Sequence, residues 1–194
     1  MGRPSLRVKL REVSSQLDQL SAWQGLSLES RVWAERLNEL RFVRATLAWE
    51  EFLEQSFICY LRGSQSIHGR AYALQVSASA TSSNAQQVAI GNNQFGKWLN
   101  EHWTLMRANA LFQGQHPYQP LAAPSFTTIR KLRNRIVHRS DNVRLQFRTI
   151  ATSIYGSWPR GMTPGRLLTE VENGSPRIDN YLNLMKATAT LIAS

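Results

Sequence analysis

The chain has 194 residues, 42% of them hydrophobic, which suits one folded domain with a hydrophobic core. It has no apolar run of about 18 residues, which argues against a transmembrane helix, and its single cysteine excludes an internal disulfide framework and a multi-cysteine metal site. The formal net charge is +10 and 19 of the 23 basic residues are arginine, which favours a nucleic-acid partner because arginine makes bidentate contacts to phosphate.

The first half of the chain has the apolar spacing of two helices. The opening residues, MGRPSLRVKLREV, have no apolar core of the kind that a signal peptide carries, so we expect a cytoplasmic protein. Apolar side chains recur every three or four positions from Leu6 to Leu20, as on an amphipathic helix. The next periodic segment predicts one long helix from about Leu28 to Leu61, with Gly63 as its stop.

One stripe of the long helix is apolar and then becomes charged. It holds Trp33, Leu37, Leu40 and Leu47, and it continues through Arg44 and Glu51. Tryptophans at helical spacing are more typical of a core than of a binding surface. We therefore expect four of them to be buried: Trp33, Trp49, Trp98 and Trp103.

The middle of the chain alternates between loops and one helix. Residues 62–93 are rich in Ser, Gly, Asn and Gln and are predicted to form a long loop insertion, in which AYALQVSASATSS fits either a short strand or an ordered loop. A helix is expected from Gln94 to Phe112. Residues 113–124 contain three prolines, which predicts another loop.

Further helices are expected toward the end. The first covers Ser125–Arg139 with Ser125 as its N-cap, and the second follows with Asp141 as its cap. Thr163-Pro164 and Ser175-Pro176 each look like a cap followed by proline at the first helical position. The whole predicts an all-α single domain over residues 1–194, a bundle of five to six helices.

The positive charge is concentrated in one short segment. Between Pro124 and Arg148 the only acid is Asp141, so this segment carries +6 of the net +10. Its seven basic residues are Arg130, Lys131, Arg133, Arg135, Arg139, Arg144 and Arg148.

A helical wheel separates these basic residues. Arg133 falls on the apolar face of the Ser125–Arg139 helix, where an uncompensated charge costs several kcal/mol. Asn134 and His138 are four residues apart at one edge, so their side chains can touch. Arg133 and His138 are about 140° apart on a straight helix, so they act together only if the helix frays near His138 or if two copies meet across a two-fold axis.

The segment LRNRIVH, Leu132 to His138, resembles the R-x4-6-H signature of HEPN-domain ribonucleases. The resemblance rests on this short motif and on an all-helical chain of suitable length with the motif on a late helix. It implies a helical bundle that forms a homodimer, with both motif copies in one composite site that cleaves RNA without a metal or cofactor. Such proteins serve as toxins or antiviral defence effectors, sometimes with an antitoxin partner.

The chemistry implied for this motif is self-consistent. RNA supplies its own nucleophile, the 2′-OH, and a histidine with an ordinary pKa of about 6.5 accepts that proton near neutral pH. Arg133 is expected to stabilise the phosphorane, and Asn134 to orient His138 or a phosphate oxygen. The flanking basic residues are expected to bind the RNA backbone: Arg130, Lys131, Arg135, Arg139 and Arg144.

Other residues offer weaker candidates. Glu51 or Glu54 of the long helix is a possible carboxylate partner for Arg133, although an Arg44–Glu51 ion pair is the preferred interpretation. His102 is expected in the core, while His68 and His116 lie in predicted loops without metal-ligand neighbours. Arg62 and His68 also match the R-x5-H spacing, inside a Gly/Ser-rich loop.

Two rival functions stay open from the sequence. One is a HEPN-like module that binds RNA or nucleotides without cutting them. The other is a helical DNA-binding protein that inserts the Ser125–Arg139 helix into a groove, although the long proline-rich loop before it is unlike a helix-turn-helix.

Overall fold

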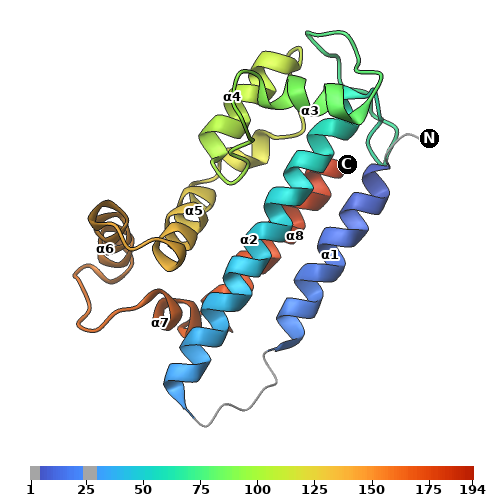
Figure 1. The fold of residues 1–194 in the computed structure, drawn as a ribbon. Coiled ribbons are helices and arrows are strands. Elements are labelled where there is room, and N and C mark those ends of the chain that lie inside the picture. The colour runs from blue at the N-terminus through green and yellow to red at the C-terminus, as the bar shows by residue number, and fades with distance from the viewer. Residues whose placement is uncertain (1–4, 24–29) are drawn as a thin grey trace.

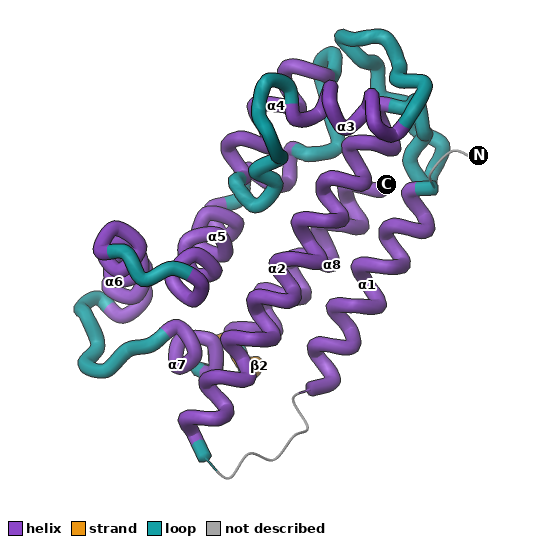
Figure 2. The backbone as a smooth tube through the Cα atoms, in the orientation of Figure 1, coloured by secondary structure: helices purple, strands orange, loops and turns teal. Residues whose placement is uncertain are grey.

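The computed structural model describes residues 5–23 and 30–194 as a bundle of α-helices (Figures 1 and 2). The described part contains α1 (Leu6–Ala22), α2 (Arg31–Leu61), α3 (Ser82–Ile90), α4 (Glu101–Leu111), α5 (Pro124–Val137), α6 (Asp141–Tyr155), α7 (Pro164–Thr169) and α8 (Arg177–Ala193), with a 3-10 helix η2 (Gln119–Ala122). Two short strands, β1 (Val171–Glu172) and β2 (Ser175–Pro176), pair antiparallel. The predicted all-α class is confirmed, but these ranges hold eight helices rather than five or six.

The central helix is α2, which packs against α1 and α8 along its length and against α5 and α7 on another side (Figure 1). Aromatic residues on its buried faces join it to these neighbours. Phe42 meets Tyr181 of α8 edge to face with ring centroids 5.7 Å apart, and Trp49 stacks on Phe126 of α5 at 5.5 Å. Both α2 residues are at most 1% exposed, so the start of α5 is tied to a rigid part of the core.

A buried arginine in the first half of α2 links three helices. Arg41 is 2% exposed, and its guanidinium donates to the Leu20 carbonyl of α1 at 2.8 Å, to Asn38 Oδ1 at 2.6 Å and to Asp179 Oδ1 of α8 at 3.2 Å. Burial is the main cause of the lowered pKa of Arg41 and of the raised pKa of Asp179, and the attraction between the two charges opposes both shifts. The sequence pattern did not reveal this site.

Several predicted boundaries in the first two thirds are revised. The predicted start of the long helix at Leu28 lies outside the described residues, while its end at Leu61, before Gly63 at φ +77°, is confirmed. Residues 62–93 are not loop throughout, because Thr81 caps α3 by accepting from the Asn84 N–H. The helix predicted from Gln94 begins only at Glu101, since the Trp98 indole folds over Gly96, where a Cβ atom would lie 2.2 Å from its Nε1.

Caps in the last third are revised in the same way. The motif helix starts at Pro124, so Ser125 lies within its first turn and does not cap it, and it ends at Val137 with His138 in extended conformation. The N-cap of α6 is Ser140 rather than Asp141. Thr163 caps α7 as predicted, but Ser175-Pro176 forms β2, and α8 starts one residue later.

One of the tryptophans predicted in the core lies on the surface. Trp49, Trp98 and Trp103 are buried as expected, but Trp33 is 68% exposed. Leu40 and Leu47 of the same stripe are 47% and 51% exposed, so this face of α2 is uncovered in the described chain. Within the described ranges, no helix is long and apolar enough to cross a membrane.

Candidate functional site

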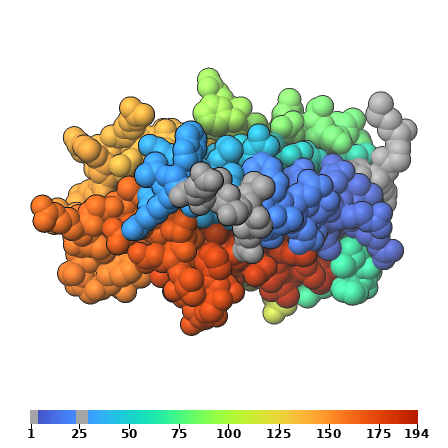
Figure 3. Space-filling view, turned by 90° about the horizontal axis from the view of Figure 1, so that it is seen from below, coloured from blue at the N-terminus to red at the C-terminus, as the bar shows by residue number. Residues whose placement is uncertain are grey.

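A cleft of about 670 Å³ opens where the end of α5 faces the first turns of α2. Its lining comes from α2, α5, the α5–α6 turn, α6 and the start of α7: Val32, Glu35, Arg36, Glu39, Arg135, Ile136, Arg139, Arg144, Thr163 and Pro164. We call this the arginine cleft. A second hollow of about 440 Å³ shares Arg135 and Arg144 with it and is also lined by Arg148 and Trp158. Figure 3 shows this end of the molecule, with the light-blue start of α2 beside the orange surface that follows α5.

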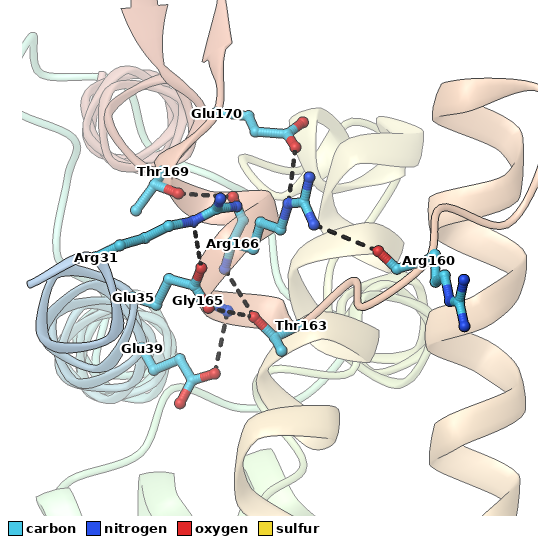
Figure 4. A network of polar contacts seen from close by, with 9 residues as sticks. All are labelled: Arg31, Glu35, Glu39, Arg160, Thr163, Gly165, Arg166, Thr169 and Glu170. Carbon is cyan, nitrogen blue, oxygen red and sulfur yellow. Dashed lines mark hydrogen bonds and ion pairs between the residues drawn. The ribbon is translucent and has the colours of Figure 1, made fainter.

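The two acids of the arginine cleft hold α7 against α2 (Figure 4). Glu35 accepts hydrogen bonds from Thr163 Oγ1 at 2.8 Å and from Arg31 Nε at 3.1 Å. Glu39 accepts from the Gly165 N–H at 3.0 Å. The helices approach so closely that a Cβ atom on Gly165 would lie 2.5 Å from the Glu35 carbonyl oxygen. These carboxylates are therefore already engaged by the fold.

The arginines at the end of α5 are not engaged in this way. The side chains of Arg135 and Arg139 have no hydrogen bond or ion pair to any other described residue, and the guanidinium of Arg144 makes only a 3.4 Å contact to the exposed Asp141. Glu39 also receives a hydrogen bond from Arg36 at 3.2 Å. The cleft therefore presents an excess of positive charge to an incoming anion.

Arg133 points from α5 toward α2, as its place on the apolar face predicts. Its Nη2 lies 4.0 Å from Glu50 Oε2, its Nη1 donates to Asn134 Oδ1 at 3.4 Å, and its buried Nε has no acceptor. Burial raises the pKa of Glu50, and this rise is opposed by the Arg133 charge and by a hydrogen bond from the Leu99 backbone N–H. A carboxylate partner for Arg133 was expected, and it is Glu50.

The predicted supporting residues, Glu51 and Glu54, do not contact Arg133. Glu51 is exposed beside α1, and Glu54 accepts from Gln86 Nε2 of α3 at 2.9 Å. The preferred Arg44–Glu51 ion pair is also absent from the described residues, where Arg44 lies 5.9 Å from the Trp23 ring centroid. The signal that was missed is that Glu50 precedes the buried Leu53 by three residues and the buried Phe57 by seven, so it shares their helix face.

His138 is exposed and lies just beyond the last turn of α5. Its backbone N–H donates to the Asn134 carbonyl at 2.8 Å, so it is the C-cap residue rather than a helical one. No hydrogen bond joins its side chain to Arg133 or to Asn134 within the described chain. Within one chain the two groups therefore have different surroundings: Arg133 faces Glu50 of α2, while His138 is exposed to solvent.

Arg130 is committed to the fold rather than to a ligand. Its guanidinium donates to both carboxylate oxygens of Glu101, at 2.8 and 3.1 Å, and Thr127 Oγ1 donates to the same carboxylate at 2.6 Å. This joins α5 to the start of α4. We therefore remove Arg130 from the predicted RNA-binding set, while Lys131, Arg135, Arg139 and Arg144 remain in it.

The bridge between Arg130 and Glu101 leads to a stability prediction. Burial favours the neutral form of Glu101, but the hydrogen bonds from Arg130 and Thr127 outweigh it, so the pKa of Glu101 is lowered. A carboxylate whose pKa is lowered in the folded protein contributes stability at pH values above its ordinary pKa. This contribution is lost as the pH falls through the lowered pKa. Glu101→Gln should lower the free energy of unfolding by about 2 kcal/mol at pH 7 and by much less at pH 3.

Urea unfolding of both proteins at the two pH values measures this difference. Glu12→Gln is the matched control, because Glu12 forms only an exposed pair with Lys9 and should change stability by less than about 1 kcal/mol. An equal loss for Glu101→Gln at both pH values would contradict the assignment.

One of the remaining histidines differs from its prediction, while His68 and His116 lie in loops as expected. His102 is exposed rather than buried in the core. His116 is 4% exposed; its Nδ1 accepts from the Tyr118 N–H at 3.2 Å, and its Nε2 lies 3.0 Å from Asn109 Oδ1. Burial lowers the pKa of His116, which suits a neutral structural residue. Residues 5–23 and 30–194 contain no group of three or more His, Cys, Asp or Glu side chains placed to hold a metal ion.

Comparison with known proteins leaves the site to be judged on its own chemistry. No family model, no curated protein and no solved structure matched the chain.

Proposed function

We propose that this protein is a metal-independent endoribonuclease of the HEPN type, whose active site is built from Arg133 and His138 of two copies of the chain. The observation that carries the proposal is the setting of His138. This exposed histidine comes directly before Arg139, which lines a cleft with an excess of arginine. A proton acceptor beside a phosphate-binding surface is what cleavage of RNA by its own 2′-OH requires.

The proposed reaction is an in-line transesterification. His138 removes the proton from a ribose 2′-OH, the oxygen attacks the adjacent phosphorus, and the bond from phosphorus to the 5′-oxygen breaks. The leaving 5′-oxygen takes up a proton from water, and the protonated His138 returns its proton to solvent. The products are a 2′,3′-cyclic phosphate and a 5′-OH end. Arg133 stabilises the additional negative charge on the phosphorane, and Arg135, Arg139 and Arg144 hold the neighbouring phosphates.

The proposal uses a second copy because Arg133 is turned toward its own α2 and has no contact with the His138 of its own chain among the described residues. Arg133 points toward Glu50 of its own α2, whereas His138 lies past the end of α5. Asn134 lies between them, with its side-chain oxygen accepting from Arg133 and its carbonyl from the His138 N–H. In the proposal Asn134 keeps Arg133 oriented, and a partner subunit brings its own histidine near.

One observation favours a second candidate, an RNA-binding module without catalysis. Glu50 already faces Arg133, and an arginine balanced by a carboxylate stabilises a phosphorane less well. In that case Arg135, Arg139 and Arg144 bind RNA and Arg133 only ties α5 to α2. A cellular role as a toxin or antiviral defence effector, with an antitoxin or defence-system partner, belongs to the first candidate.

A substrate comparison tests the proposal. The purified protein is incubated in EDTA with an RNA oligonucleotide, with the all-DNA equivalent, and with RNA carrying one 2′-deoxy nucleotide at the cleaved position. We expect cleavage of RNA only, with loss of the cut at the deoxy position and products that end in a 2′,3′-cyclic phosphate. Binding of RNA without any cut points to the second candidate, and cleavage of the DNA strand overturns the proposal.

A further inference from the structure

The uncovered stripe of α2 has the spacing of a helix–helix interface. Trp33, Leu37, Leu40, Arg44, Leu47 and Glu51 follow one another at intervals of four, three, four, three and four residues. That alternation keeps them within about 80° of one side of the helix and is the seam spacing of coiled coils. Along it, Trp33, Leu40 and Leu47 are 68%, 47% and 51% exposed.

A groove lies beside this stripe, further along α2. Its volume is about 570 Å³, and its walls come from both α1 and α2, with Leu20, Trp23, Arg44 and Leu47 among them. The guanidinium of Arg44 lies over the Trp23 ring at 5.9 Å, which makes this end of the groove aromatic and positively charged. Such a site accepts an indole, because aromatic rings attract cations at their faces.

We infer that a second copy of the chain covers this stripe in an antiparallel α2–α2 pair, in which each Trp33 enters the α1–α2 groove of the other copy at Arg44. The pairing follows from the positions themselves. If the two-fold axis crosses α2 between Asn38 and Glu39, Trp33 faces the partner's Arg44, and Leu37 faces the partner's Leu40. Both contacts occur twice, so one self-complementary surface closes the dimer.

The composition of the stripe argues against the parallel arrangement. In a parallel pair each residue faces its own copy, so Arg44 would meet Arg44 and Glu51 would meet Glu51. Like charges in contact are unfavourable. The antiparallel register instead gives two leucine layers flanked by two tryptophan–arginine contacts, and these two residue types are the most frequent anchors of protein interfaces.

The same axis has a consequence for the arginine cleft, and this step rests on the proposed function. In Figure 1, α1 flanks α2 on one side, and α5 and α7 flank it on the other. At 100° per residue, the stripe falls between the α2 residues that line the arginine cleft and those that face α1. An antiparallel two-fold across the stripe keeps both α5 helices on the same side. Since Ile136 and Arg139 line the cleft together with Glu35 and Glu39, the two clefts come to the same level, beside the axis.

Disulfide trapping tests the register directly. Trp33→Cys and Arg44→Cys chains are co-expressed with different tags and oxidised mildly. We expect a disulfide only between the two different variants, because in either variant alone the introduced cysteines are separated by 11 residues of helix, about 16 Å. The native Cys59 is buried, and burial raises the pKa of its thiol to about 11, so it does not interfere.

Light scattering at micromolar concentration gives the second measurement. Leu40→Glu should convert the dimer to a monomer with unchanged helical circular dichroism, while Leu191→Glu, at an exposed leucine of α8, should leave it dimeric. A monomeric wild type, a dimeric Leu40→Glu protein, or cross-linking of Trp33→Cys with Glu51→Cys instead of Arg44→Cys overturns the inference. Neither measurement uses RNA, so each result can be assigned to one proposal. A disulfide-trapped dimer without ribonuclease activity rejects only the proposed function. RNA cleavage by the protein, when the two cysteine variants form no disulfide, rejects only the α2 pair.

Discussion

Replacing His138 with alanine should lower the rate of RNA cleavage by at least about a hundredfold, because the general base of the reaction is lost. RNA binding should change by less than about twofold, since Arg135, Arg139 and Arg144 remain to hold the phosphates. The exposed position of His138 makes this variant safe to interpret. Its side chain is exposed, so the thermal unfolding midpoint should stay where it is.

The chain offers a matched control for this experiment. His68 is also exposed, and it follows Arg62 with the spacing R-x5-H, so it satisfies the bare pattern without the helix. His68→Ala should cleave RNA as fast as the wild type. Cleavage rates and filter-binding affinities are measured for all three proteins, purified in parallel to reveal contaminating ribonucleases.

The outcome separates the two functions considered for this fold. If His138→Ala cuts at the wild-type rate, the motif does not form the active site. If the wild type and His138→Ala both bind RNA but do not cut it, and Arg135→Ala weakens the binding, the arginine cleft is a binding surface only. A loss of cleavage together with an unchanged affinity is the result that the proposed reaction requires.

The helices were predicted best, because the spacing of apolar residues along a helix depends only on residues that are near one another in the sequence. The spacing from Leu6 to Leu20 and the stop at Gly63 lie where the helical repeat puts them. Boundaries failed where a contact between distant residues decides them. The helix predicted from Gln94 starts late because Trp98 turns into the aromatic core and packs on Phe57 of α2, at a centroid distance of 4.9 Å.

The candidate site was predictable in kind but not in its pairings. The helical wheel placed Arg133 on the apolar face of its helix, which predicted a carboxylate partner. The neighbouring residues Glu50 and Glu51 of α2 lie near different helices, Glu50 near α5 and Glu51 beside α1. Only the packing of α2 shows that Glu50 is the partner of Arg133. The apolar spacing that predicted a helix through Trp33 and Leu40 also does not show whether another helix packs on that face. In this chain it is covered by no described residue, which turned an expected core stripe into a candidate interface.

Arg41→Ala should be the most damaging single substitution for stability, with a loss of about 3–5 kcal/mol in the free energy of unfolding. The guanidinium is 2% exposed and donates to one acceptor from each of α1, α2 and α8. Alanine removes these donors and the positive charge opposite the buried carboxylate of Asp179. Arg31→Ala is the control on the same helix, where an exposed pair with Glu35 contributes less than about 1 kcal/mol.

The pH dependence of this loss identifies its cause. Burial already raises the pKa of Asp179 against the attraction of Arg41, so removal of Arg41 should raise that pKa further. A carboxyl whose folded pKa is raised contributes stability at low pH and loses it as pH rises through the folded value. Guanidinium unfolding should therefore show a larger deficit for Arg41→Ala at pH 7 than at pH 4. The double variant Arg41→Ala/Asp179→Asn should be more stable at pH 7 than Arg41→Ala alone. If the loss of stability on replacing Arg41 is instead the same at both pH values, and the same with Asp179 as with Asn at position 179, lost packing rather than the buried charge causes it.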